Sequence, residues 1–314
     1  MAAVQTTAAE REEWLLPRRR RIPVISPVWK FIRQKPLAAF GGLIIVTVLF
    51  IAFFAPLVTW HSPTDVPVQF DLEGGSGGGL NRLADPSTDH IMGTDDKGRD
   101  VWARVAYGSR ISMQVGFAAV AIAVSVGTII GLVSGYFGGW TDTLVQRLVD
   151  AMLAFPPLIL ALAIVGLLGP ETSNLIISIG IIASPSIARV VRGAVLSAKE
   201  NQYVEAARSV GANPTRIMFR HVLPNVTAPI IIIGTALLGT AILVEASLAF
   251  LGFGTPPPDP SWGRMLSGEG RQYMVAGAWW IAVFPGLAIT ISVLGFNLLG
   301  DGLRDVLDPR LRGV

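Results

Sequence analysis

The sequence predicts an all-α, polytopic membrane protein with six transmembrane helices. Its composition is the first reason: 51% of the 314 residues are hydrophobic and 15% are charged, whereas soluble domains carry about 25% charged residues. The second is a mean hydropathy of +0.55. The third is six long apolar runs without a charge, each able to form one membrane-spanning helix of about 20 residues. So many runs in one chain argue against the alternative, a large soluble protein with buried helices.

Each apolar run can supply one span. In chain order the predicted spans are Pro36–Trp60, Ile111–Thr141, Ala151–Pro170, Thr172–Ala188, Val222–Val244 and Gln272–Gly300. The first run is longer than the roughly 7–15 apolar residues of a signal peptide, so we expect residues 36–60 to stay as the first transmembrane helix. The third and fourth runs are separated only by a few residues around Gly169-Pro170-Glu171, which predicts a tight hairpin.

The distribution of Lys and Arg predicts the orientation. Of the 25 such residues, 18 lie in segments 1–35, 137–150, 189–221 and 301–314, and 7 lie between them. Because cytoplasmic loops are rich in Lys and Arg, we expect a multi-pass protein of a bacterial or archaeal inner membrane with both termini in the cytoplasm. Residues 1–35 and 301–314 are then a basic cytoplasmic segment and a cytoplasmic tail, residues 61–110 an extracytoplasmic loop, and residues 111–300 a five-helix core.

Two segments have a composition that is also found in nucleotide-binding or nucleic-acid-binding segments, but neither segment supports such a function. The glycine-rich insert 74–79 lacks the Gly-Lys-Ser/Thr ending of a phosphate-binding loop, and the chain has no Gly-Lys pair. The run Arg18-Arg19-Arg20-Arg21 has no folded domain around it and is placed to meet lipid headgroups. We therefore expect neither an ATP site in this chain nor nucleic-acid binding. The chain also has no cysteine, which excludes thiolate metal sites and disulfides.

The loop between the fourth and fifth spans, residues 189–224, predicts two short helices joined by a turn. Residues 196–210 are good helix formers, and Gly211 is placed to end that helix in a left-handed conformation. Asn213 is typical of a helix N-cap and Pro214 of the first helical position. The second helix is expected to stop before Pro224.

The same loop resembles the EAA loop of ABC importer permeases. Glu205-Ala206-Ala207 is followed by Gly211, and Leu223-Pro224 stands near the end of the second predicted helix. The family usually has a hydrophobic residue two positions before the Leu-Pro pair, where this chain has His221; this departure resembles the peptide-importer branch.

The resemblance extends over roughly residues 28–312. Its further motifs are similar to those of the second permease of dipeptide and oligopeptide importers: His90 to Arg104, Gly135 to Asp142, Glu245 to Gly254 and Asp308-Pro309-Arg310. Residues 1–25 and the insert 74–79 have no place in it.

What the resemblance implies is a permease subunit, not an enzyme, with no cofactor of its own. It implies a homologous permease as partner, two separate ATPase subunits, an extracytoplasmic substrate-binding protein and a peptide substrate. The loop is then the ATPase-coupling element, through Glu205, Ala206, Ala207, Gly211, Asn213, Pro214, His221, Leu223 and Pro224. Relatives also handle glutathione, opines and nickel complexes, so the substrate stays open.

Three other interpretations compete with that of a permease subunit. A metal site of His90, Asp95 and Asp96 competes with ordinary turn chemistry, because Gly93-Thr94-Asp95 and Lys97-Gly98 are turn formers; we expect no metal. Glu245, an ionisable residue directly after the apolar run Val222–Val244 and near the outer end of the fifth span, suggests an ion-coupled secondary transporter as the alternative function. We expect it instead to make an interhelical hydrogen bond or to line an external vestibule.

A membrane-embedded enzyme would need a nucleophile, base or metal set, and the spans contain none of the usual motifs.

Overall fold

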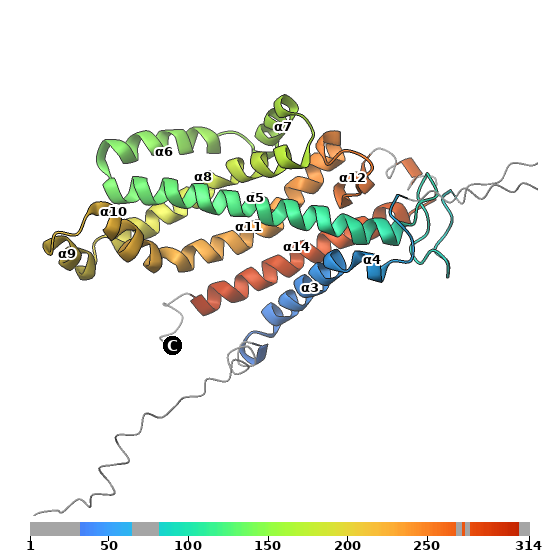
Figure 1. Ribbon diagram of the computed structural model, residues 1–314, viewed down its shortest axis with the longest axis horizontal. Coiled ribbons are helices and arrows are strands. Elements are labelled where there is room, and N and C mark those ends of the chain that lie inside the picture. The colour runs from blue at the N-terminus through green and yellow to red at the C-terminus, as the bar shows by residue number, and fades with distance from the viewer. Residues whose placement is uncertain (1–31, 65–81, 268–271, 274–276, 308–314) are drawn as a thin grey trace, which may run out of the picture. The chain divides into compact units, whose positions relative to one another are not determined.

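The computed structural model describes residues 32–64, 82–267, 272–273 and 277–307 (Figure 1). The run Arg18–Arg21, the insert 74–79 and residues 308–314 lie outside these ranges. Contacts divide the chain into Met1–Pro36, of which only residues 32–36 are described, and a compact unit from Leu37 onward. The described part of that unit is helical and has no strand, apart from one isolated bridge between Thr94 and Asp100.

Five helical segments among the described residues are long and apolar enough to cross a membrane. They are α3 (Pro36–Phe53), α5 (Val101–Phe137), α8 (Thr172–Ala198), the continuous segment Pro214–Phe253 that contains α11 (Thr227–Leu248), and α14 (Trp280–Leu307). A sixth crossing exists if α6 (Gly139–Leu153) and α7 (Pro157–Leu168), which meet at 90°, are counted as one broken span.

The predicted third span Ala151–Pro170 is interrupted, because α6 ends at Leu153 and α7 begins at Pro157. Pro156 has an extended ψ of 126° and Pro157 begins α7. A proline disfavours the helical conformation of the residue before it and cannot donate a backbone hydrogen bond, so Pro156-Pro157 breaks the run. The first span, predicted over 36–60, is also interrupted: α3 ends at Phe53, and the short α4 (Ala55–Val58) follows, with Pro56 in its first turn.

Several helices extend beyond their apolar runs. Helix α5 begins at Val101 rather than Ile111, because Asp100 caps it by accepting from the Ala103 amide at 2.7 Å. Helix α8 continues to Ala198, and α14 runs from Trp280 to Leu307 rather than from Gln272 to Gly300. Hydropathy marks only the apolar part of a helix, whereas its backbone hydrogen bonds continue through polar residues.

Helices α5 and α8 lie side by side and form the largest contact of the described bundle (Figure 1). Gly127, Gly131 and Gly135 recur every fourth residue on the contact face of α5. A Cβ added at Gly131 would lie 2.5 Å from the Ala188 carbonyl oxygen, and one at Gly127 would lie 2.6 Å from that of Ser184. The helices thus pack through a small-residue seam, which membrane helices use to bring their backbones together.

Helix α11 contacts α5, α8 and α14. Two buried tryptophans tie the ends of α5 and α14 to their surroundings. Trp262, in α12 (Trp262–Leu266), donates its Nε1–H to the Val105 carbonyl at 2.9 Å, and Trp280 donates to the Thr94 carbonyl at 3.0 Å. Figure 1 shows α4 and α12 at one end of the helices, while α9 (Gln202–Ser209) and α10 (Pro214–Ile217) lie at the opposite end.

Candidate functional site

The predicted helix over residues 196–210 is broken near its beginning. Helix α8 ends at Ala198, a turn follows, and α9 begins at Gln202. The Asn201 Nδ2 donates to the Ala198 carbonyl at 3.0 Å, and the Lys199 ammonium donates to the Gly135 carbonyl at 2.9 Å. These side chains add hydrogen bonds to carbonyls at the ends of α8 and α5, and the chain turns here without a glycine or proline.

The turn that follows α9 has the predicted local structure. Gly211 has a φ of +76°, in the left-handed region. The Asn213 side chain accepts from the Thr215 amide at 3.3 Å as N-cap of α10, and Pro214 is the first residue of that helix. Nothing lies within 4 Å of a Cβ built on Gly211, so a substitution there is opposed by backbone conformation and not by a clash.

The predicted stop before Pro224 is wrong. The chain stays helical through a π-helical turn over Met218–Val222 and a 3₁₀ turn over Leu223–Val226, and then enters α11. A proline removes one backbone donor and crowds the carbonyl four residues earlier, and these irregular turns accommodate it. Asn225 donates to the His221 carbonyl at 2.6 Å, and Thr227 donates to the Pro224 carbonyl at 2.8 Å. These side chains replace part of the lost backbone hydrogen bonding.

Apolar side chains anchor this region to the helices beneath it. Val204, Ile217, Met218, Val222 and Val226 are buried in one cluster with residues of α5 and α8. Val204 is 0% exposed and Ile217 is 1% exposed, and complete burial of such a side chain contributes about 1.5–3 kcal/mol. Helices α9 and α10 are therefore attached to the ends of the long helices as one packed piece.

The outward side of the same piece carries most of the predicted site residues. Exposed residues are Glu205, Ala206, Gly211, Asn213, Pro214 and Pro224, while Ala207, His221 and Leu223 are half-buried and Ala207 and Leu223 pack against the cluster. Three large apolar side chains are exposed beside them: Tyr203, Val210 and Phe219, with Val210 84% exposed. We call these twelve residues the loop surface.

The exposed Glu205 of the loop surface is available for a partner, and exposed arginines lie beside the loop surface in the sequence. Within the described part of the chain, the Glu205 carboxylate forms no ion pair or hydrogen bond, although its backbone carbonyl accepts from Ser209. Arg208, Arg216 and Arg220 are exposed nearby in the sequence. An exposed surface that combines apolar side chains with charges of both signs has the composition of a protein-binding site.

Two ion pairs, which the sequence did not predict, join α6 to α8. Arg192 donates to both carboxylate oxygens of Asp142, at 2.6 and 2.5 Å, and Arg189 donates to Asp150 at 2.7 Å. The first pair is bidentate and mostly buried, with side chains 30% and 16% exposed, whereas the second is half exposed. Residues so far apart in sequence carry no local signal that they pair.

Glu245 is fully buried between helices. Its Oε2 accepts from Ser112 of α5 at 3.1 Å, and the Ser261 side chain also lies against the carboxylate. Oε1 has no hydrogen-bond partner of good geometry among the described residues. The contact is interhelical, one of the two positions expected for this residue; a carboxylate at 0% exposure does not line an open vestibule in this chain.

The structure does not assemble His90, Asp95 and Asp96 into one site. Asp95 accepts from the amides of Lys97 and Arg99, each at 2.9 Å, and its other oxygen accepts from the Arg99 side chain at 2.7 Å. This is the turn chemistry expected for the segment. His90 instead contacts Asp100, together with His61, a grouping that the sequence analysis missed.

Comparison with protein families identifies two matching regions. Residues 127–313 match the family described as binding-protein-dependent transport system inner membrane component. Residues 26–74 match the N-terminal transmembrane domain of oligopeptide transport permease C. The two regions together include the loop surface and most of the described helices.

Curated relatives cover nearly the whole chain. The dipeptide transport system permease protein DppC of Alkalihalophilus pseudofirmus is 45% identical over 92% of this chain and 91% of its own length. The glutathione transport system permease protein GsiD of Escherichia coli is 42% identical, over 91% of this chain and 90% of its own. These relatives give no support to the alternative of an ion-coupled transporter that uses Glu245.

A solved structure shares the fold. A chain of the MetNI methionine ABC transporter in an inward-facing conformation aligns with a TM-score of 0.52 and 17% identity, covering 65% of this chain and 96% of its own. At this identity the likeness establishes the helical arrangement alone.

Proposed function

Since this chain belongs to the family of binding-protein-dependent transport system inner membrane components, we propose that it is the permease subunit of an ABC importer for di- or oligopeptides. The dipeptide permease that is 45% identical over 92% of this chain carries the substrate part of the proposal. In this assembly a homologous permease completes the pathway, two ATPase subunits bind on the cytoplasmic side, and an extracytoplasmic binding protein delivers the peptide.

The loop surface is the proposed contact with an ATPase subunit. Its exposed side supplies the apolar Tyr203, Val210 and Phe219 together with the carboxylate of Glu205, which has no ion partner among the described residues. Small residues at 206, 207 and 211 let a partner approach the backbone closely. The buried side is anchored by Val204 and Ile217 to the cluster between α5 and α8, so a displacement of α9 and α10 is transmitted to the long helices as a rigid movement.

The proposed orientation has both termini and the loop surface in the cytoplasm. The excess of Lys and Arg in segments 1–35, 189–221 and 301–314 supports it. The arrangement of the helices is consistent with it, because α9 and α10 lie at the same end of the bundle as the C-terminal end of α14 (Figure 1).

Hydrolysis of ATP is assigned to the partner subunits. The chain has no Gly-Lys pair, and a phosphate-binding loop needs this pair to hold the nucleotide phosphates. The role of the permease is then mechanical: closure of the ATPases displaces the loop surface, and the helices attached to it change the access of the pathway from outside to inside.

Peptide uptake tests the proposal. The chain, its partner permease, the ATPases and the binding protein are produced together in a host without peptide importers, and uptake of a radiolabelled dipeptide is measured. We expect ATP-dependent uptake that is lost when this chain alone is omitted. Uptake of glutathione but of no di- or oligopeptide would overturn the substrate assignment, and uptake that persists without this chain would overturn its role as the permease.

A further inference from the structure

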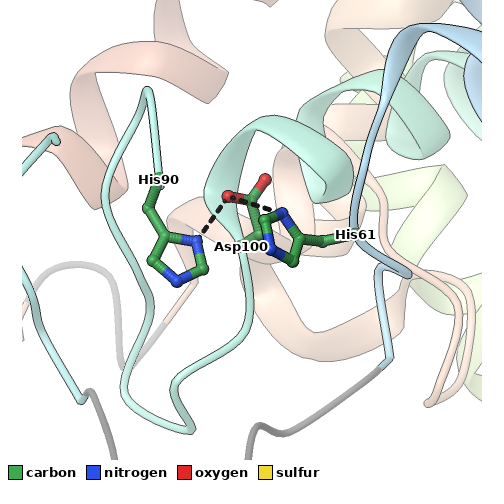
Figure 2. Close-up of side chains that lie close together, drawn as sticks. All are labelled: His61, His90 and Asp100. Carbon is green, nitrogen blue, oxygen red and sulfur yellow. Dashed lines mark hydrogen bonds and ion pairs between the residues drawn. The ribbon is translucent and has the colours of Figure 1, made fainter. Parts of the chain in front are cut away.

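We propose that His61, His90 and Asp100 form a binding site for a divalent transition metal, with Zn²⁺ as the best-fitting ion. One ligand atom from each residue lies within 4.8 Å of the other two. The His90 Nδ1 is 2.8 Å from the Asp100 Oδ2, and the His61 Nδ1 is 3.9 Å from the same oxygen. Figure 2 shows the two imidazole rings on either side of the carboxylate, each linked to it through Nδ1. This inference does not depend on what the protein transports.

These distances suit a metal after small side-chain rotations. Zn²⁺ binds His nitrogen and carboxylate oxygen at about 2.0–2.2 Å in tetrahedral geometry, so neighbouring ligand atoms stand roughly 3.3–3.4 Å apart around the ion. One observed contact is shorter than this and the other is longer. Two imidazoles and one carboxylate supply three ligands, and a water completes the tetrahedron. Binding through the His90 Nδ1 uses the neutral tautomer that carries its proton on Nε2, so a proton hydrogen-bonded to Asp100 at Nδ1 is replaced by the ion while the ring takes up a proton from solvent at Nε2.

The Asp100 carboxylate is oriented for metal binding because its two oxygens have separate roles. The Asp100 Oδ1 accepts from the Ala103 amide at 2.7 Å and caps α5. That bond holds the side chain so that Oδ2 faces the histidines. Asp100 is only 5% exposed, and the neighbouring Arg99 and Arg104 pair with Asp95.

The backbone that carries the ligands is also held in place. The Trp102 indole donates to the Val58 carbonyl at 3.1 Å, and the Arg104 guanidinium donates to the Pro63 carbonyl at 3.2 Å. These bonds fix the segment containing His61 against the start of α5. Binding therefore needs little reorganisation of the chain, which favours affinity.

The second histidine distinguishes a metal site from a simple helix cap. The hydrogen bond from His90 to Asp100 is complete without His61, yet the His61 ring lies with its centroid 4.8 Å from that of His90. The His61 side chain is 41% exposed, whereas His90 is 10% exposed. An ion from solvent can thus reach the site through His61. The bound ion would cross-link the segment after α4 to the start of α5.

Zinc titration of the full chain tests the proposal. The protein carries an affinity tag without histidine, is reconstituted in lipid nanodiscs and is freed of metal with a chelator. Titration with ZnCl₂ should show one Zn²⁺ bound per chain and a rise in Tm, while MgCl₂ should do neither, because Mg²⁺ prefers oxygen ligands.

The variants separate ligation from folding. The chain has three histidines, and the third, His221, belongs to the loop surface at the other end of the helices, so His221→Ala is the matched control. His61→Ala changes a half-exposed residue, and Asp100→Asn keeps a side chain that can cap α5. Each of these two should weaken Zn²⁺ binding at least about tenfold, and His221→Ala should leave it unchanged. Absence of stoichiometric binding to the unmodified chain, or equal binding by His61→Ala, would show that His90 and Asp100 form only a capping pair.

Discussion

Gly131 of α5 lies directly against the backbone of Ala188 in α8: a Cβ at Gly131 would be 2.5 Å from the Ala188 carbonyl oxygen and 2.8 Å from the Val191 Cβ. Real Cβ atoms do not approach a carbonyl this closely, so even a methyl group would force the two helices apart. The close approach of α5 to α8 at this point therefore depends on the absence of a side chain at Gly131.

Gly131→Ala tests this contact. Overpacking costs about 1–3 kcal/mol, so we expect Tm to fall, as measured by thermal unfolding of the chain in nanodiscs. Gly193→Ala is the matched control, because that glycine is in α8 and has nothing within 4 Å of its built Cβ. Alanine is the better helix former by up to about 1 kcal/mol, so the control should have an equal or higher Tm. If both changes lower Tm equally, the packing of α5 against α8 does not depend on the absence of a side chain at Gly131.

The Asp142–Arg192 pair should couple α6 to α8 more strongly than the Asp150–Arg189 pair does. The first pair is bidentate and mostly buried, while both members of the second are about half exposed. We expect Arg192→Met to cost on the order of 1 kcal/mol and Arg189→Met a few tenths. A double-mutant cycle of Arg192→Met and Asp142→Asn should show a favourable coupling energy between the two side chains. If the coupling energy is zero, the loss of stability in Arg192→Met comes from packing and not from the ion pair.

Gly211 and Glu205 test the loop surface as the ATPase contact. A β-branched residue adopts a φ of +76° at high cost, whereas Asn tolerates this region. Gly211→Val should therefore reduce co-purification of the ATPase subunits and transport, and Gly211→Asn should largely preserve both.

Glu205→Lys reverses an exposed charge of the loop surface and should also weaken docking of the ATPase subunits. Membrane insertion should be normal in all three, as checked by the amount in the membrane fraction. Normal ATPase binding and transport in both Gly211→Val and Glu205→Lys would reduce the loop to a connector.

The orientation is tested with reporter fusions. A reporter that is active only in the cytoplasm should be active when it is fused after Gly211 and silent when it is fused after Gly78. A reporter that is active only outside the cytoplasm should give the opposite result at the same two positions. If both reporters show the reverse pattern, the termini are outside and the loop surface does not face the ATPases.

Local sequence was sufficient for the features that depend on a few neighbouring residues. The turn at Gly211, Asn213 and Pro214 has the predicted conformation, because glycine, asparagine and proline each favour their positions through their own backbone or side-chain chemistry. The apolar runs likewise located the hydrophobic helices, since burial in lipid requires apolar side chains whatever the tertiary arrangement. The resemblance of the loop to importer permeases was carried by residues close together in the chain.

Tertiary structure decided the features that depend on distant residues or on competing local tendencies. Pro224 was expected to end a helix, but π-helical and 3₁₀ turns continue it, with Asn225 and Thr227 satisfying the freed carbonyls. The burial of Glu245 against Ser112 and the meeting of His61 and His90 at Asp100 join segments far apart in sequence. Such contacts follow from how whole helices pack, and that packing depends on the surfaces of all of them together, which periodicity and composition along one chain do not specify.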